Sequence, residues 1–146
     1  MTRTATLLFT ALGAFALGAG ALALYRATVP AEGVASCRKG AAQMARMELL
    51  FGASRHDGSA VGEVEWQAFL DAEVTPRFPK GLTVLTGYGQ WQSGDRIGKE
   101  GSRLLLIWYA PTADSEARIE AIRNSYKARF GQESVMRVDG LSCVAF

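Results

Sequence analysis

One short stretch of the chain combines paired glycines with polar and aromatic side chains. Gly87 and Gly89 alternate with Tyr88 and Gln90, and Trp91 follows. In a strand, both glycines and Trp91 would lie on one face, because successive side chains point to opposite faces. Isolated glycines in a strand indicate a bulge or the close approach of a ligand or another chain. Two interpretations stay open: a ligand site gripped by Tyr88, Gln90 and Trp91, or a twisted strand packed against another subunit with Trp91 in the core.

A second candidate for binding is Arg77, which lies between Pro76 and Pro79. The prolines stiffen the backbone around the arginine, and a guanidinium matches the geometry of a carboxylate. We expect the partner of Arg77 to be Glu100, Glu133 or an anionic ligand. A structural salt bridge and a ligand contact are both compatible with this spacing.

The remaining polar candidates lie in predicted loops. Arg129, Gln132 and Glu133 surround the end of a predicted helix, where we expect them to cap the helix and position the loop, with ligand binding as a secondary role. His56 is the single histidine, and we expect it to be exposed. A hydrolytic triad would need His56, and nothing else in the sequence supports one. One histidine and two distant cysteines also form no plausible ligand set, so we expect no metal site and no cofactor.

The charges divide the chain at its N-terminal end. Residues 5–25 carry no charge and 16 of these 21 residues are apolar, whereas acidic and basic residues balance after Arg26. An apolar run preceded by Arg3 is typical of a signal peptide, but about 20 apolar residues can also span a bilayer. We therefore expect a signal peptide or membrane anchor over residues 1–31. The protein is then periplasmic or secreted, or anchored to the inner membrane by residues 5–25. The neutral remainder predicts no nucleic-acid partner.

Two cysteines, Cys37 and Cys143, follow this segment. In an oxidising compartment an even cysteine count favours one disulfide. Residues 34–37 also resemble a lipobox, in which Cys37 would be acylated, although Cys37 lies 12 residues beyond Tyr25. Disulfide formation, lipidation and free thiols are the three alternatives.

Hydrophobic periodicity predicts six elements in the order βαββαβ. Alternating or continuously apolar runs predict strands over residues 44–53, 82–92, 103–110 and 134–138, with residues 97–100 extending the central hairpin. Apolar spacings of three and four predict helices from Gly62 to Pro76 and from Asp114 to Gly131.

This order predicts an α+β, ferredoxin-like fold, with an antiparallel four-stranded sheet and two helices on one face. We expect a linker over residues 32–43 and a single domain over residues 44–146. In the usual strand order, 4-1-3-2, the first and last strands are antiparallel neighbours. The fold therefore offers Cys37 and Cys143 a meeting place. Closing so long a loop stabilises a chain by about 4–5 kcal/mol in the chain-entropy model.

Three blocks of the chain resemble a known family. They are residues 48–52 (ELLFG), residues 74–91 (VTPRFPKGLTVLTGYGQW) and residues 126–138 (YKARFGQESVMRV). Together they are similar to the exported bacterial family known as domain of unknown function 3574, over about residues 44–146. The resemblance implies export and carries no established activity.

The strand over residues 103–110 is apolar on both faces. A ferredoxin-like sheet covers one face with helices and leaves the other open, and an open apolar face is normally covered by a partner or a ligand. We therefore expect a homodimer through this face. The two apolar sets that alternate along the strand are Leu104, Leu106 and Trp108, and Leu105, Ile107 and Tyr109.

Three classes of function are compatible with these features. The leading hypothesis is a non-enzymatic exported module that binds a small ligand or an envelope partner and self-associates through its sheet face. The alternative is an enzyme of the dimeric ferredoxin-like barrel type that acts on a small apolar or aromatic molecule, as cofactor-independent oxygenases do; this is analogy of fold alone. The third is a structural accessory of the envelope. No catalytic residue is predicted.

Overall fold

The computed structural model describes residues 36–146, so the predicted signal peptide or anchor lies outside the described residues. The elements follow the predicted order: β1 (Ala42–Gly52), α2 (Glu63–Phe69), the short π-helix η1 (Leu70–Val74), β2 (Thr83–Ser93), β3 (Arg96–Tyr109), α3 (Ser115–Phe130) and β4 (Met136–Val144). Within this described part, no helix is long and apolar enough to span a bilayer.

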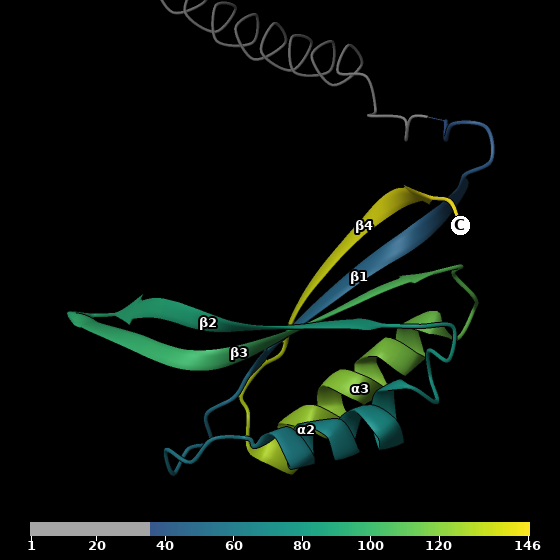
Figure 1. Ribbon diagram of the computed structural model, residues 1–146. Coiled ribbons are helices and arrows are strands. Elements are labelled where there is room, and N and C mark those ends of the chain that lie inside the picture. The colour runs from purple at the N-terminus through teal and green to yellow at the C-terminus, as the bar shows by residue number, and fades with distance from the viewer. Residues whose placement is uncertain (1–35) are drawn as a thin grey trace, which may run out of the picture. The chain divides into compact units, whose positions relative to one another are not determined.

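The four strands form one antiparallel sheet in the order β2-β3-β1-β4, with β1 and β3 at its centre. Helices α2 and α3 pack side by side under one face of this sheet (Figure 1). This arrangement confirms the predicted α+β, ferredoxin-like fold.

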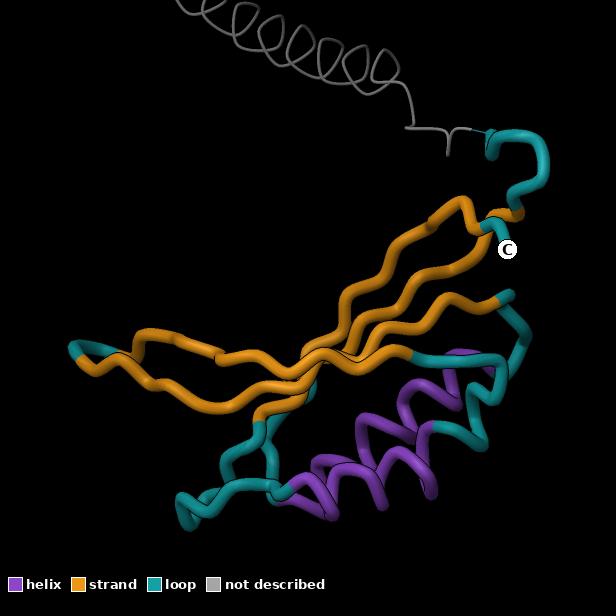
Figure 2. Tube along the Cα trace, in the orientation of Figure 1, coloured by secondary structure: helices purple, strands orange, loops and turns teal. Residues whose placement is uncertain are grey.

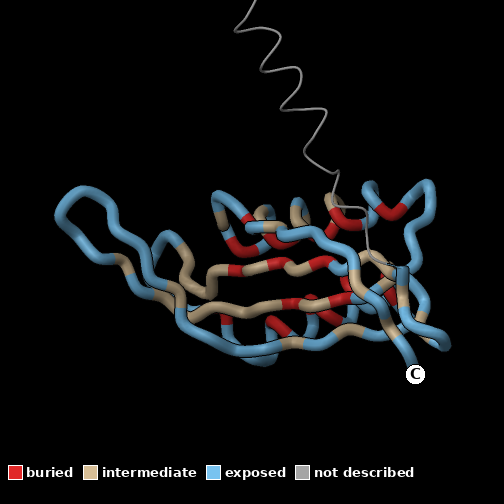
Figure 3. The backbone as a smooth tube through the Cα atoms, turned by 90° about the horizontal axis from the view of Figure 1, so that it is seen from above, coloured by how far each residue is buried: buried red, intermediate tan, exposed pale blue. Residues whose placement is uncertain are grey.

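The core lies between the sheet and the two helices. Strand β1 contributes Met47, Leu49 and Phe51, all fully buried, while exposure returns at the positions between them. The same alternation runs along the central strands (Figure 3). Phe51 meets the helices edge to face, with ring centroids 5.2 Å from Trp66 and 4.6 Å from Tyr126. Such contacts add to the stabilisation that burial of the rings provides.

The first helical segment does not stop at α2 but continues as η1, a wider turn in which the hydrogen bond spans five residues instead of four. The amide of Thr75 donates to the carbonyl of Leu70 at 2.9 Å, and Pro76 then ends the segment. The continued helical path places Glu73 and Arg77 one turn apart, and their side chains form an ion pair at 3.0 Å. This pairing, and not one with Glu100 or Glu133, is the salt bridge that Arg77 makes.

Strands β3 and β4 are longer than their sequence patterns predict. The prediction that residues 97–100 extend the hairpin is confirmed, and β3 is continuous from Arg96 to Tyr109. Strand β4 runs on through Asp139 and Gly140, residue types with weak strand propensity. Its pairing with β1, in register from Leu50↔Met136 to Ala42↔Val144, outweighs that local preference.

The last part of β4 carries Cys143, which bonds to Cys37. The chain turns at Gly40, which has a φ of 83°, a left-handed value that favours glycine. Cys37 therefore lies beside Cys143, and the two residues form a disulfide with their Cα atoms 5.4 Å apart. The disulfide predicted from strand order is confirmed.

Candidate functional site

The β2–β3 hairpin extends beyond the helices at one end of the sheet (Figure 2). Strand β1 ends at Gly52, opposite Ser102, so the outer part of β3 pairs with β2 alone. In this outer part Trp91 lies opposite Gly98. A methyl group on Gly98 would come within 2.5 Å of the Trp91 ring, so only glycine allows the indole to lie across β3.

The root of the hairpin forms one side of an open pocket of about 580 Å³, here called the hairpin pocket. Its lining comes from three segments that are distant in sequence: the hairpin, the loop after β1 and the turn from α3 to β4. The lining residues are Ser54, Arg55, His56, Trp91, Glu100, Gly131, Gln132, Glu133 and Ser134.

Polar side chains converge above Gly52, next to this pocket. A methyl group on Gly52 would lie 2.8 Å from both carboxylate oxygens of Glu100 and 2.8 Å from Oε1 of Gln132. The backbone N–H of Ser54 donates to Oε2 of Glu100 at 3.2 Å, and Nε2 of Gln132 donates to the carbonyl of Ser54. Glycine at position 52 therefore leaves the room in which two side chains from different segments meet.

The backbone beneath this meeting point is held by Tyr126. Its hydroxyl donates to the carbonyl of Gly52 at 2.8 Å. Burial raises the pKa of Tyr126 to about 12, so the hydroxyl keeps its proton and donates at neutral pH. Helix α3 thereby fixes the end of β1.

Arg55 lies at the edge of the pocket, but its guanidinium is engaged elsewhere. It pairs with Glu65 at 2.7 Å, donates to the carbonyl of Ala60 at 2.8 Å and lies 5.6 Å from the centre of the Phe130 ring. The hydrogen bond from Arg55 lowers the pKa of Glu65, which keeps that carboxyl ionised. Arg55 thus anchors the loop after β1 against the helices.

The structure brings together Trp91, Glu100, Gln132 and Glu133 from the predicted site residues. The other candidates lie elsewhere. Tyr88 is 95% exposed, and Gln90 is exposed on the same face of β2. Arg129 packs over the ring of Phe130. Arg77 lines a separate pocket of about 210 Å³ near the end of β3, together with Trp108 and Tyr109.

Sequence reasoning missed the contributions of Ser54, Arg55 and Ser134 to the pocket, because they come from irregular loops with no periodic pattern. The pairing of Trp91 with Gly98 could have been predicted from the sequence. A tight turn centred on Gly94 and Asp95 fixes the register of the hairpin, and that register sets the large residue opposite the small one.

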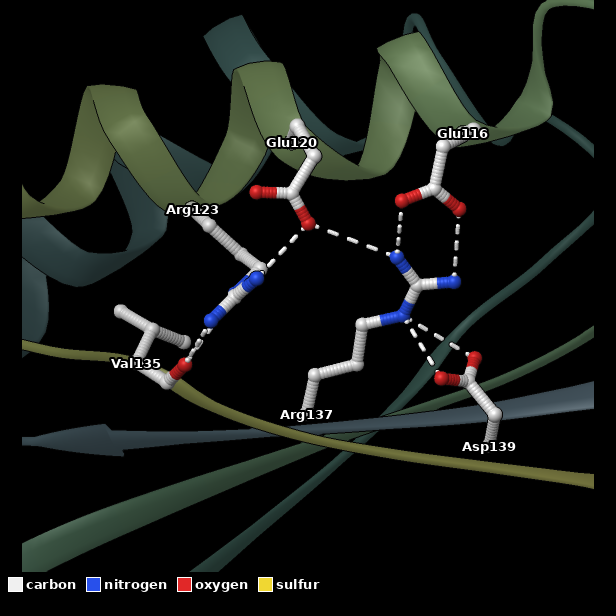
Figure 4. A network of polar contacts seen from close by, with 6 residues as sticks. All are labelled: Glu116, Glu120, Arg123, Val135, Arg137 and Asp139. Carbon is white, nitrogen blue, oxygen red and sulfur yellow. Dashed lines mark hydrogen bonds and ion pairs between the residues drawn. The ribbon is translucent and has the colours of Figure 1, made fainter.

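A second cluster of charged residues joins α3 to β4 and is fully paired (Figure 4). Arg137 contacts Glu116 through two nitrogens, at 2.7 and 2.9 Å, and Asp139 at 2.9 Å. The hydrogen bond to Glu116 raises the pKa of Arg137 and lowers that of Glu116. Arg123 bridges Glu120 to the carbonyl of Val135 (Figure 4).

The sheet face opposite the helices is apolar and uncovered, here called the open face. By alternation from the buried residues of β1, it carries Arg46 and Glu48 of that strand. These two residues form an ion pair with each other. Around them the side chains are apolar, and several are between 37% and 59% exposed. The exposed apolar residues are Leu85, Trp108, Met136 and Val138.

Among the residues that the structure describes, no group of three or more histidine, cysteine or acidic side chains is placed to hold a metal ion. The hairpin pocket offers carboxylate and amide acceptors and an aromatic ring.

Comparisons with known proteins support the fold and identify the family. No curated protein matches the chain. A phage SAM lyase in complex with S-methyl-5'-thioadenosine shares 11% identity at a TM-score of 0.54, covering 79% of this chain and 97% of that one. CutA from Synechococcus elongatus shares 14% identity at a TM-score of 0.44, covering 68% of this chain and 80% of that one. At 11% identity, the likeness to the phage SAM lyase shows the fold alone. The model of a family described as a protein of unknown function, DUF3574, matches residues 46–146, and the chain belongs to that family.

Proposed function

We propose that this protein is an exported, non-enzymatic binding module that holds a small ligand in the hairpin pocket and forms a homodimer through its open face. The observation that carries the proposal is the pocket itself, which three separate chain segments build around Trp91 and Glu100. Its volume of about 580 Å³ falls in the range of small-molecule sites.

The loops around the pocket are held in place by contacts to the folded body. Gln132 ties the α3–β4 turn to Ser54, and Tyr126 ties the end of β1 to α3. Arg55 fixes the intervening loop through Glu65. A pre-organised site loses little entropy when a ligand binds, which favours a binding role.

Self-association is supported by the composition of the open face. Exposed apolar patches of this kind usually meet a partner. The Arg46–Glu48 pair makes the face self-complementary, because a twofold axis between two copies can place Arg46 of one copy against Glu48 of the other. Charge complementarity thus favours a second copy of this chain as the occupant.

Export is supported by the disulfide. A bond between Cys37 and Cys143 persists in an oxidising compartment and is rare in the cytosol. Cell fractionation tests this part of the proposal: we expect the protein in the periplasm or the medium, with both cysteines resistant to alkylation until a reductant is added. Recovery in the cytosol with two alkylated thiols would contradict it.

Native mass spectrometry of protein purified without denaturation tests ligand binding. We expect a bound small molecule that dissociates on activation. The Trp91→Ala variant should lose this molecule, whereas Tyr88→Ala, which truncates another aromatic side chain of the same strand outside the pocket, should retain it. An identical mass for bound and unfolded protein, or equal loss in both variants, would contradict a ligand role for the pocket.

Light scattering coupled to size exclusion tests the homodimer. We expect twice the chain mass at micromolar concentration, and a monomer for Val138→Asp, which buries a charge in the interface. Val64→Asp is the matched control, because Val64 is 84% exposed on α2, away from the open face. A monomeric unmodified protein, or a monomer in both variants, would refute this interface.

A further inference from the structure

The hairpin pocket contains the glutamates that the rest of the domain leaves unpaired. Of the eight glutamates in residues 36–146, six form ion pairs with arginine. The two glutamates of this part of the chain without such a pair are Glu100 and Glu133, and both line the pocket. Most glutamates in this part of the chain are therefore paired with an arginine. The two that are not both lie where a ligand could bind.

Two acceptor groups beside the pocket, the Glu100 carboxylate and Oε1 of Gln132, face the same space above Gly52. Gln132 must direct its NH₂ group at the carbonyl of Ser54, because a carbonyl cannot donate, and this leaves Oε1 turned toward Glu100. Glu100 takes the Ser54 N–H at 3.2 Å, but a carboxylate accepts several hydrogen bonds. A charged donor placed between Glu100 and Gln132 would satisfy both.

The nearby arginine does not fill this position, and the pocket has an aromatic wall. Arg55 is held by Glu65 and by the carbonyl of Ala60. Trp91, half exposed, lies across Gly98 and lines the same pocket as Glu100. The face of an indole attracts cations and packs against apolar groups.

From these contacts we propose that the hairpin pocket binds an organic ammonium ion. Its NH₃⁺ group donates to Glu100 and to Oε1 of Gln132, Glu133 adds negative charge, and its hydrocarbon or aromatic body packs on Trp91. This inference rests on the proposed function, in which the hairpin pocket is a ligand site. It adds the ligand's charge, donor group and apolar part.

The probe for this site is 2-phenylethylamine, and its neutral and anionic counterparts are 2-phenylethanol and 3-phenylpropionate. Titration into the full exported protein is followed by the indole N–H signals of ¹⁵N-labelled tryptophan. We expect the amine to shift the Trp91 signal, assigned from Trp91→Phe, and to leave buried Trp66 unmoved. The alcohol and the carboxylate should bind at least about tenfold more weakly, because they lack the charged donor.

Charge-matched variants locate the interaction. Glu100→Gln should weaken amine binding by about tenfold and Glu133→Gln by less, since a charge-assisted hydrogen bond is lost only in the first. Asp95→Asn removes the same charge at the hairpin tip and should change binding by less than about twofold, since exposed charges are screened. The amide spectrum of each variant verifies that it is folded.

Several results would overturn the ammonium site. They are equal binding of amine and alcohol, preference for the carboxylate, equal weakening by Glu100→Gln and Asp95→Asn, displacement of the amine by calcium or magnesium ions, or no response of Trp91 to the amine. If Trp91 responds to the alcohol or the carboxylate at least as strongly as to the amine, the pocket still binds a ligand and only the ligand class fails. If it responds to none of the probes, the ammonium class fails, and carried-over ligand in the native mass measurement decides the proposed function independently.

Discussion

Carboxylates are paired with arginine at the α3–β4 contact, whereas the glutamates of the hairpin pocket are not. Between α3 and β4, Glu116 and Asp139 share the guanidinium of Arg137 (Figure 4). In the pocket, Glu100 and Glu133 line a cavity beside Trp91 and form no ion pair with any described residue. Paired charges hold two layers together. Unpaired charges in a concave site contribute little to folding and are the groups a ligand can neutralise.

The largest expected effect concerns the disulfide, which lies outside the pocket and joins Cys37, ahead of β1, to Cys143 near the end of β4. Cys143→Ser should lower the free energy of unfolding by about 4–5 kcal/mol, because the unfolded chain loses a loop closure of more than 100 residues. Urea denaturation measures the change, and Cys37→Ser should match it because it removes the same bond. Unequal losses of stability in the two variants would contradict this explanation. A loss of amine binding in a folded variant would show that the hairpin pocket depends on the disulfide.

The next effect should come from Arg137. Arg137→Met keeps the apolar stem but removes the group that Glu116 and Asp139 share. We expect a loss of about 1–3 kcal/mol, the usual range for hydrogen bonds to charged groups. Thermal and urea unfolding measure it. Arg96→Met, at the exposed tip of the hairpin, should stay within about 0.5 kcal/mol, and an equal loss there would show that charge balance, not the α3–β4 contact, matters.

Features set by local pattern and topology could be predicted from the sequence. Gly131, expected to end the second helix, adopts a φ of 67° and lies at the C-terminal cap of α3. The even cysteine count favoured a disulfide, and the strand order placed the two cysteines together, since β1 and β4 are neighbours in the fold that the element order indicates.

Features set by contacts between distant segments could not be predicted. Glu100 meets Gln132 only because both the hairpin and the α3–β4 turn end beside Gly52. The partner of Arg77 was missed because the sequence predicted the helix to end at Pro76. The amides of Arg77 and Phe78 still donate to the carbonyl of Val74, and this further turn keeps Arg77 within reach of Glu73.

The pH dependence of stability should also differ between the two regions. The hydrogen bond from Arg137 lowers the pKa of Glu116 from 4.5 in the folded state. A lowered folded pKa stabilises the protein at pH values above the unfolded pKa, and this contribution is lost as the pH falls through the folded value. Urea midpoints between pH 7 and pH 3 should therefore fall less in Glu116→Gln than in the unmodified protein. If the urea midpoint falls equally with pH in Glu116→Gln and in the unmodified protein, this ion pair does not contribute to the pH dependence of stability.

The smallest effect on stability should come from making the same substitution in the pocket. Glu100→Gln removes no ion pair, and the new amide oxygen can still accept the Ser54 N–H that Glu100 accepts at 3.2 Å. We expect the free energy of unfolding to change by less than about 0.5 kcal/mol, as for most substitutions away from paired charges. Side-by-side urea curves of Glu100→Gln and Glu116→Gln measure the contrast at neutral pH. A loss in Glu100→Gln as large as in Glu116→Gln would mean that Glu100 holds the hairpin root in the folded domain, and it would remove the reason to regard this carboxylate as reserved for a ligand.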